Sequence, residues 1–564
     1  MTREVSIGTQ DFGLLREDQC FYIDKTAFIK EWWEGKDAVT LITRPRRFGK
    51  TLNMSMLDYF FSNQHAGRSD LFEGLEIWQD EKFRGMQGKY PVIFLSFAGV
   101  KQDTYEKTRK QINKLLVRIY EQHSYLLESD NLSGNEKQSF QNIKEDMDEV
   151  DAGFALNQLS VFLEKHYGRK VLIFLDEYDT PLQEAYINGY WNELTAFIRM
   201  MFNNTFKTNP SMERAVMTGI TRVSRESIFS DLNNLIVVTT TSDLYATSFG
   251  FTEEEVFAAI KEQGIAECEQ AEVKKWYDGF TFGTVTDIYN PWSITHYLKL
   301  RKFDSYWANS SGNGLVGHLL QSGDADLKME FENLLRGGFV EVAIDEQIIF
   351  DQLDTDIDAV WSLLLASGYL KYIKIIQETN EDIPVYQMAL TNFEVKRMFH
   401  NLIKGWFKKS RALSKFVTAM LQGDVRSMNY YINDVALYTF SSFDSGNQPS
   451  EKEPERFYHG FVLGLLVENA PDYIVKSNRE SGFGRYDVVL EPKDKNNVAV
   501  ILEFKVYDQE YDGEKDLSDT ADNALAQIEE KKYTADLIGQ GIAGEKIFKY
   551  GLAFKGKKCF IKRG

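Results

Sequence analysis

The chain has 564 residues, enough for about two to four domains. Hydrophobic residues make up 43% of it and charged residues 26%, which is typical of globular domains and excludes a disordered or fibrous chain. Its three cysteines, Cys20, Cys268 and Cys559, lie too far apart for a disulfide framework or a cysteine-rich zinc module. The net charge of −19 argues against binding nucleic acid or an anionic membrane through the overall electrostatic field.

The sequence predicts a cytoplasmic protein. Residues 1–8 lack the apolar core of a signal peptide, and no apolar run reaches the roughly 18 residues needed to cross a bilayer. The widely spaced cysteines fit a reducing compartment. We therefore expect no membrane partner.

The first half of the chain alternates short apolar strands with amphipathic helices. Strands are predicted at 38–43, 92–97, 171–175, 214–218 and 235–240, and helices at 52–61 and 105–121. Continuously apolar strands that are separated by helices indicate a parallel sheet covered on both faces. The fold class predicted here is therefore α/β.

The second half is predicted to be organised differently. Residues 251–440 read as a mostly helical middle region, and the polar stretch 441–455, which contains two prolines, reads as a linker. A helix at 456–467, strands at 486–490 and 498–506, a helix at 520–537 and a strand pair around 550–561 then form a compact α/β unit. The predicted domains are 1–250, 251–440 and 456–564, with the linker at 441–455.

A phosphate-binding loop is predicted after the first strand. Residues 43–51, Thr-Arg-Pro-Arg-Arg-Phe-Gly-Lys-Thr, fit the pattern G-x-x-x-x-G-K-[ST], except that Arg44 replaces the first glycine. Such a loop curls backbone N–H groups around phosphate, its lysine reaches the β- and γ-phosphates, and its Ser or Thr hydroxyl binds Mg²⁺. The candidate nucleotide-binding residues are Arg46, Arg47, Phe48, Gly49, Lys50 and Thr51, the last of which is also a metal candidate.

Two further strand ends supply partners for this loop. Asp176 and Glu177 end the strand at 171–175, where Asp176 is predicted to hold Mg²⁺ and Glu177 to polarise the attacking water. Thr218 ends the next strand and can sense the γ-phosphate, and Arg222 and Arg225, which follow it, can act on phosphate from the same crevice. The alternatives are a basic turn, solvated acids and surface arginines, but the joint occurrence favours a nucleotide site.

The C-terminal unit contains a second constellation of charged residues. Asp487, Glu503 and Lys505 give the spacing D-x(15)-E-x-K on two neighbouring strands, and Glu503 and Lys505 share one strand face. Asp487 and Glu503 can hold Mg²⁺ or Mn²⁺, and Lys505 can stabilise charge on a scissile phosphate. Gln527, on the following helix, can face the same site. The alternative is a cross-strand salt bridge.

Three other features accompany this pattern. Lys531 lies one helical turn after Gln527. Glu455 and His459 stand at i, i+4 spacing before the strands and are further candidates for the site. The tail 546–564 is rich in lysine and is the best candidate for contact with a phosphate backbone, unless it is a solvated strand face.

These motifs together resemble known families. The segments starting at Asp24 (Asp-Lys-Thr), Arg44, Asp176 (Asp-Glu-Tyr-Asp-Thr-Pro), Thr218 (Thr-Gly-Ile-Thr-Arg) and Tyr289 (Tyr-Asn-Pro-Trp-Ser) resemble the AAA-ATPase-like family of bacterial proteins. The C-terminal pattern, which ends with Gln527 and Tyr533, resembles the PD-(D/E)XK nuclease superfamily. The resemblance implies a P-loop core of the additional-strand ATPase type, a helical lid and a restriction-endonuclease-like fold, and it implies that Arg44 is usual at its position.

The function expected from residues and resemblance is a hydrolase that binds and hydrolyses ATP and cuts phosphodiester bonds. Its expected cofactors are ATP and Mg²⁺, with Mn²⁺ as an alternative at the nuclease site, and its expected partner is nucleic acid, with DNA as the class. One alternative is a nucleotide-controlled switch that grips nucleic acid without cutting, although the intact Asp487, Glu503 and Lys505 argue against it. Another is a scaffold ATPase whose middle region binds a protein or a second copy.

Overall fold

The computed structural model describes residues 3–222, 228–229, 232–310, 314–322, 325–335, 337–345, 353, 357–377, 384–407, 412–440, 472–481, 484–507, 514–555 and 558–564. They form two compact units, here called unit 1 (Met1–Leu315 with Gly337–Met398) and unit 2 (Val316–Arg336 with Phe399–Gly564). No helix within these residues is long and apolar enough to span a bilayer.

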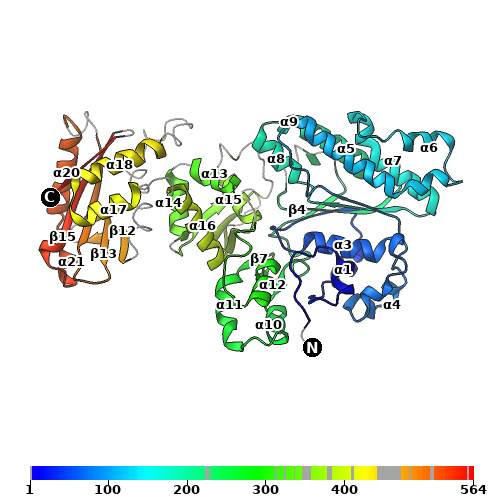
Figure 1. Ribbon diagram of the computed structural model, residues 1–564, viewed down its shortest axis with the longest axis horizontal. Coiled ribbons are helices and arrows are strands. Elements are labelled where there is room, and N and C mark those ends of the chain that lie inside the picture. Colours follow the sequence, from blue (N-terminus) through cyan, green and yellow to red (C-terminus); the bar gives the residue numbers. More distant parts are fainter. Residues whose placement is uncertain are drawn as a thin grey trace. The chain divides into compact units, whose positions relative to one another are not determined.

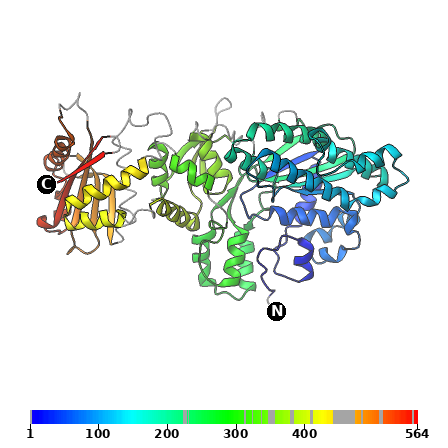
Figure 2. The ribbon, with the colours of Figure 1, turned by 45° about the horizontal axis from the view of Figure 1, so that its top comes forward.

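A five-stranded parallel sheet organises unit 1 (Figures 1 and 2). Its strand order is β2-β3-β4-β1-β5, so β4 lies between β1 and β3. The predicted α/β class with a parallel N-terminal sheet is confirmed, and the inserted strand is the arrangement expected of an additional-strand ATPase. The strands are β1 (Val39–Thr43), β2 (Val92–Ser96), β3 (Val171–Asp176), β4 (Met212–Gly219) and β5 (Leu235–Val238).

Helices cover both faces of this sheet, with α1, α3 and α4 on one face and α5, α7 and α9 on the other (Figure 1). Both faces are therefore removed from water, which explains why the strands are apolar throughout. The helices are α1 (Phe12–Glu17), α2 (Ala27–Gly35), α3 (Lys50–Phe61), α4 (Glu81–Arg84), α5 (Tyr105–Gln122), α6 (Gly134–Gln141), α7 (Glu149–Tyr167), α8 (Thr180–Asn188) and α9 (Trp191–Phe202).

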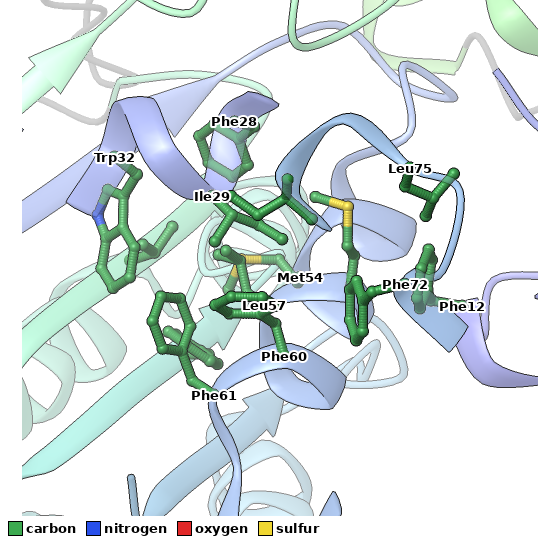
Figure 3. Packing of buried hydrophobic residues seen from close by; sticks show 14 of the residues in the cluster. Phe12, Phe28, Ile29, Trp32, Met54, Leu57, Phe60, Phe61, Phe72 and Leu75 are labelled. Carbon is green, nitrogen blue, oxygen red and sulfur yellow. The ribbon is translucent and has the colours of Figure 1, made fainter. Parts of the chain in front are cut away.

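The α3 side of the sheet holds an aromatic-rich core (Figure 3). Leu57 and Phe60 of α3 have no exposed surface, and they belong to one cluster with Ile42 of β1 and Phe174 of β3. Because α3 begins at the end of the predicted phosphate loop, this packing fixes the loop's exit against the sheet.

The rest of unit 1 carries two small antiparallel sheets, with strand orders β6-β8-β7 and β10-β11-β9. The predicted middle region thus contains strands as well as helices. Its elements are β6 (Phe251–Thr252), α10 (Glu253–Glu262), α11 (Gln270–Tyr277), β7 (Phe280–Phe282), β8 (Val285–Tyr289), α12 (Pro291–Leu300), β9 (Val340–Ala343), α15 (Ile357–Ala366), β10 (Leu370–Gln377), β11 (Val385–Leu390) and the start of α16 (Phe393–Phe407).

Unit 2 is built on a five-stranded mixed sheet of order β12-β13-β14-β15-β16, in which only β14 and β15 run parallel within the described residues. The predicted C-terminal α/β fold is confirmed. Its elements are α13 (Gly314–Ser322), α14 (Ala325–Leu335), α17 (Ala412–Gln422), α18 (Val425–Phe440), β12 (Tyr473–Ser481), β13 (Gly484–Pro492), β14 (Ala499–Val506), α20 (Leu517–Glu530), α21 (Ala535–Gly539), β15 (Ile547–Lys555) and β16 (Lys558–Arg563).

The two faces of this sheet have different partners. Helices α17 and α18, from the predicted middle region, share a core with alternate residues of β14 such as Leu502. Ala499 and Ile501, on the opposite face, pack with Ile528 of α20. The predicted linker 441–455 and the predicted helix at 456–467 lie outside the described residues, so the domain boundaries stay a prediction.

The Phe60→Ala substitution should destabilise unit 1 by about 3–5 kcal/mol, because it leaves a cavity in a core that cannot collapse around it. Chemical denaturation followed by fluorescence measures the effect. The control is Phe154→Ala on α7, where 40% of the side chain is exposed and a change of less than about 1 kcal/mol is expected. Equal losses in the two variants would contradict the assignment of this core.

Candidate functional site

The phosphate loop, residues 44–50, joins the fully buried strand β1 to α3. Gly49 caps α3 at φ +81°, and Arg47 also takes a left-handed conformation at φ +66°. Left-handed residues turn successive N–H groups toward one side and so form an anion-binding nest, here at a helix N-terminus. The loop therefore has a backbone suited to phosphate.

Arg44, at the position of the missing glycine, is completely buried. Its guanidinium donates hydrogen bonds to the carbonyl oxygens of Thr43, Thr239 and Leu244 and lies 4.5 Å from the ring centre of Phe282. The side chain thus ties the start of the loop to the segment after β5. The Arg44 side chain therefore anchors the start of the phosphate loop. A glycine at this position would make none of these contacts and would leave the loop more flexible.

Lys50 is buried at the start of α3, and its Nζ donates to the carbonyl oxygens of Arg44 and Pro45, both at 2.8 Å. Burial lowers the pKa of Lys50 to about 8, while the nearby carboxylates of Glu177, Asp179 and Asp176 act in the opposite direction. The amine is therefore held inside the loop with three acids close by.

Three hydroxyl groups converge on Asp176, which has no exposed surface. The hydroxyl of Thr51 donates to Oδ2 at 2.9 Å, that of Ser96 to the same oxygen at 3.3 Å, and that of Thr218 to Oδ1 at 2.6 Å. Burial raises the pKa of Asp176, and the hydrogen bond from Thr218 opposes the rise. Ser96 was not predicted, although it ends β2, the strand beside β3, and the rule that strand ends gather at one sheet edge points to it.

Glu177 follows Asp176 in a left-handed conformation at φ +51°. Its N–H donates to the hydroxyl of Thr218 at 3.2 Å, and its Oε2 accepts from the hydroxyl of Thr180 at 3.2 Å. Thr218 therefore bridges the two predicted acids, because it donates to Asp176 and accepts from Glu177. The structure brings these three predicted residues together at one end of the sheet.

Asp179 forms a hub that the sequence did not single out for the site. Its Oδ2 accepts the N–H groups of Ile220 and Thr221, both at 2.9 Å, and the amide of Gln183 at 3.1 Å. Gln183 in turn accepts from the guanidinium of Arg46 at 3.3 Å. This chain of hydrogen bonds joins the phosphate loop to the segment after β4.

Arg222 lies after β4 on the wall of a small cavity of about 20 Å³. The hydroxyl-bearing residues Thr43, Thr239 and Thr240 line this cavity from the ends of β1 and β5, and Ser362 lines it from α15. The predicted arginine thus belongs to the same sheet edge as the phosphate loop. Arg225 lies outside the described residues.

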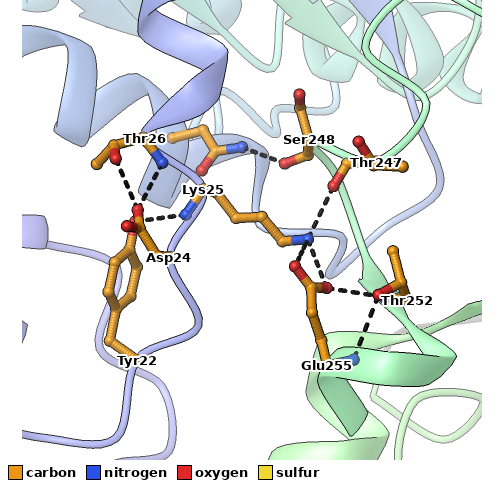
Figure 4. Close-up of polar contacts among 9 residues, drawn as sticks. Tyr22, Asp24, Lys25, Thr26, Thr247, Ser248, Thr252 and Glu255 are labelled. Carbon is orange, nitrogen blue, oxygen red and sulfur yellow. Dashed lines mark hydrogen bonds and ion pairs between the residues drawn. The ribbon is translucent and has the colours of Figure 1, made fainter. Parts of the chain in front are cut away.

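The Asp-Lys-Thr motif forms a buried polar link (Figure 4). Lys25 Nζ donates to Glu255 of α10 at 2.7 Å and to the carbonyl oxygen of Thr247 at 2.8 Å, and burial lowers the pKa of Lys25. Asp24 accepts from the N–H of Thr26 at 2.9 Å, which fixes the turn that presents Lys25. The motif therefore joins the N-terminal segment to the helix that follows the parallel sheet.

Glu503 and Gln527 meet in unit 2. Glu503, on β14, is 2% exposed and accepts a hydrogen bond from the side-chain amide of Gln527 on α20. The neighbouring position on β15 is Gly551, where a Cβ would lie 2.3 Å from the carbonyl oxygen of Ala521. The absence of a side chain at Gly551 therefore lets α20 approach the sheet closely enough for Gln527 to reach Glu503.

The other predicted residues of this site are placed less completely. Lys505 lies two residues after Glu503 on β14 and is half-buried. Asp487 belongs to β13, one residue before Val488, which pairs with Leu502. This register puts the backbone of Asp487 level with that of Glu503, while the side chain of Asp487 lies outside the described part of the structure. Glu455 and His459 also lie outside it.

Comparison with known proteins agrees with this geometry. Residues 6–229 match the family described as "Predicted AAA-ATPase", and residues 453–564 match the one described as "PD-(D/E)XK nuclease superfamily". The chain carries a domain of each family. A protein of Azotobacter chroococcum mcd 1, described as "Uncharacterized protein in vnfD 5'region", is 23% identical over 559 residues, which are 98% of this chain and 96% of that protein. Both resemblances found from the motifs are confirmed.

The lysine-rich tail of the nuclease-superfamily domain is partly neutralised. Lys549 pairs with Glu529 and Lys562 with Asp522 at 2.5 Å, so two of its charges are balanced by acids of α20. The side chain of Lys555 lies over the ring of Tyr507, with Nζ 3.9 Å from the ring centre. The tail is therefore in part a solvated strand face, the alternative reading of its sequence.

A cluster of acids lies beside the AAA-ATPase-like sheet. The carboxylates of Glu253, Asp278 and Asp287 approach within 4.8 Å of one another, and within the described residues no other group is so arranged. Lys274 Nζ lies 2.5 Å from Glu253, 2.9 Å from Asp287 and 3.9 Å from Asp278. Burial, helped by the neighbouring Asp287, raises the pKa of Asp278 to about 7. The cluster is an ion-pair network in which one lysine faces three acids, and the pKa of one of these acids is raised.

The Asp278→Asn substitution should remove the loss of folding free energy that ionisation of Asp278 causes in the wild type. Because the pKa of Asp278 lies near 7 in the folded protein and at 3.8 ordinarily, the folded state binds this proton more tightly, and wild-type stability falls as the pH rises from about 4 to 7. Asparagine can donate to Asp287 at every pH. We expect the variant to be more stable by about 2–4 kcal/mol above pH 8.

Urea unfolding of both proteins at several pH values measures this difference, which should shrink as the pH falls toward 4. A difference that does not change with pH would contradict the raised pKa of Asp278.

Proposed function

We propose that the AAA-ATPase-like domain binds and hydrolyses ATP. The observation that carries this proposal is the convergence of Thr51, Ser96 and Thr218 on the buried Asp176, next to Lys50 and the nest of the phosphate loop. A fully buried carboxylate that is ringed by hydroxyl donors costs folding free energy, and a nucleotide site gives a reason to keep it.

The residues divide the work according to their positions. The N–H groups of the phosphate loop bind the phosphates, and Lys50 balances the charge that develops on them. Thr51 and Asp176 offer the oxygen ligands that Mg²⁺ prefers, and the ion would neutralise phosphate charge. Glu177 orients the attacking water. Thr218 connects Glu177 to Asp176 through hydrogen bonds to both residues. Arg222 is proposed to contact phosphate from the same edge.

We further propose that the C-terminal domain cuts phosphodiester bonds in nucleic acid, with DNA as the substrate class. The buried Glu503 supports this proposal, because the side-chain amide of Gln527 holds its carboxylate in place, and carboxylate oxygens are the ligands that a divalent ion such as Mg²⁺ prefers. Asp487 would supply the second ligand, and Lys505 would stabilise the charge on the scissile phosphate. Mg²⁺ or Mn²⁺ suits this donor set.

Lys50→Ala should abolish ATP binding, and Glu177→Gln should keep binding but lower the rate of hydrolysis about a hundredfold to a thousandfold. Lys50 supplies charge to the bound phosphates, whereas Glu177 acts only on the attacking water. Titration calorimetry and phosphate release measure the two effects.

The matched control is Lys170→Ala, which removes an exposed lysine at the start of the strand that carries Asp176. It should bind ATP like the wild type. Normal turnover in Glu177→Gln would transfer the role of the base to Asp179.

Glu503→Gln should lose metal-dependent cleavage of plasmid and single-stranded DNA, because it removes a charged ligand and keeps the bond to Gln527. The wild type should also melt at a higher temperature with saturating Mn²⁺, and this shift should be lost in the variant. The assay is run with and without ATP to detect coupling.

Glu529→Gln, on the exposed side of α20, is the control and should cut like the wild type. If wild type and Glu503→Gln respond equally to Mn²⁺ and neither cuts, the nuclease proposal fails. The nucleic-acid-binding switch then takes its place.

A further inference from the structure

The outer side of the phosphate loop is held by residues from beyond the parallel sheet, two of which, Asn290 and Trp292, belong to the Tyr-Asn-Pro-Trp-Ser motif. Four consecutive loop residues, Pro45 to Phe48, contact these residues outside the loop. Phe48 packs against Phe280 at 4.7 Å between ring centres, and the guanidinium carbon of Arg47 lies 4.3 Å from the ring centre of Trp292. A Cβ at Gly368, which has φ +83°, would lie 2.8 Å from Pro45.

The fourth residue, Arg46, is held through its backbone. Its carbonyl oxygen accepts hydrogen bonds from the indole N–H of Trp307 at 2.9 Å and from the side-chain amide of Asn290 at 3.3 Å. In a trans peptide the carbonyl and the following N–H point in opposite directions. Holding the Arg46 carbonyl toward Trp307 therefore turns the N–H of Arg47 to the other side, as an anion nest requires.

One buried carboxylate holds both donors in place. Glu394, which has no exposed surface, accepts from the backbone N–H of Trp307 at 2.6 Å and from that of Ala308 at 3.2 Å. Its other oxygen accepts from the hydroxyl of Ser293 at 2.8 Å, three residues after Asn290. Glu394 thus fixes the segment of Trp307 and the first turn of α12 relative to each other.

We propose that Trp307 and Asn290 are positioning residues for the phosphate loop, and that Glu394 holds them in that role. This inference rests on the proposed ATP site and deepens it. The two donors fix the peptide plane between Arg46 and Arg47, which carries one of the N–H groups of the proposed phosphate nest. Trp307 and Asn290 act on the conformation of the phosphate loop and not on the hydrolysis step. They therefore raise the affinity for every ligand that carries a diphosphate group.

The test uses Trp307→Phe in the full-length protein, which keeps a ring and removes the N–H donor. The dissociation constants for ATP, ADP and pyrophosphate should all rise by the same factor, about tenfold, because the oriented N–H binds phosphate and not the base. In ATP hydrolysis KM should rise while kcat at saturating ATP stays near the wild-type value. Partial unfolding would also raise all three constants by one factor. The melting temperature of the ligand-free variant, which should stay well above the assay temperature, therefore separates a positioning role from a loss of folding.

The matched control is Trp78→Phe, the same chemical change at a half-buried tryptophan that stacks on Phe72. It should leave all three constants unchanged. Asn290→Ser removes the second donor while its hydroxyl can still cap α12, and it should weaken pyrophosphate binding in the same way. If Trp307→Phe does not fold, this variant decides.

The outcomes separate the two levels of the argument. If wild type binds pyrophosphate, Lys50→Ala does not, and both positioning variants bind like wild type, the positioning role is overturned while the ATP site stands. If the wild type binds neither ATP nor pyrophosphate, both proposals fail. A parallel loss for all three ligands supports the positioning role.

Discussion

The burial of Asp176 is the constraint on which the proposed nucleotide site depends. A carboxylate without solvent contact must be compensated by donors, and here three hydroxyls from three different elements supply them. Each donor stands at the end of a strand or the start of α3, so the strand order of the sheet decides which side chains reach the acid. The insertion of β4 between β1 and β3 is what brings Thr218 within reach.

The parallel sheet, the phosphate loop and the strand-end acids were predictable because each has a local pattern. The hydrogen-bond partners of these residues were harder to predict, because they come from distant parts of the chain. The sequence shows Arg44 as a departure from a motif, but only the fold shows its guanidinium capping three carbonyls. Glu394 is more than two hundred residues from the loop that it supports, and no spacing rule connects the two. The sequence shows Asp179 three residues after Asp176. It does not show that the backbone N–H groups of Ile220 and Thr221 donate to Asp179, because backbone groups have no sequence signature.

In the C-terminal domain the alternation of side chains along β14 correctly put Glu503 and Lys505 on one face, and the structure adds which helix covers it. The assignment of α17 and α18 to this sheet was not predictable, because their apolar faces would fit any neighbouring core. The contact between Glu503 and Gln527 depends on Gly551, whose effect lies in an atom that it lacks. Sequence motifs are recognised from the side chains that are present. The close approach of a helix to a sheet depends instead on small residues such as Gly551, which no motif marks.

The left-handed backbone of Glu177 has a consequence for how this chain balances folding against chemistry. A residue with a Cβ at φ +51° costs about 1–2 kcal/mol relative to glycine, which takes this conformation freely. A chain selected for stability alone would carry glycine at position 177. The protein instead retains a strained glutamate beside the fully buried Asp176, so this position records a preference for a carboxylate over a relaxed backbone.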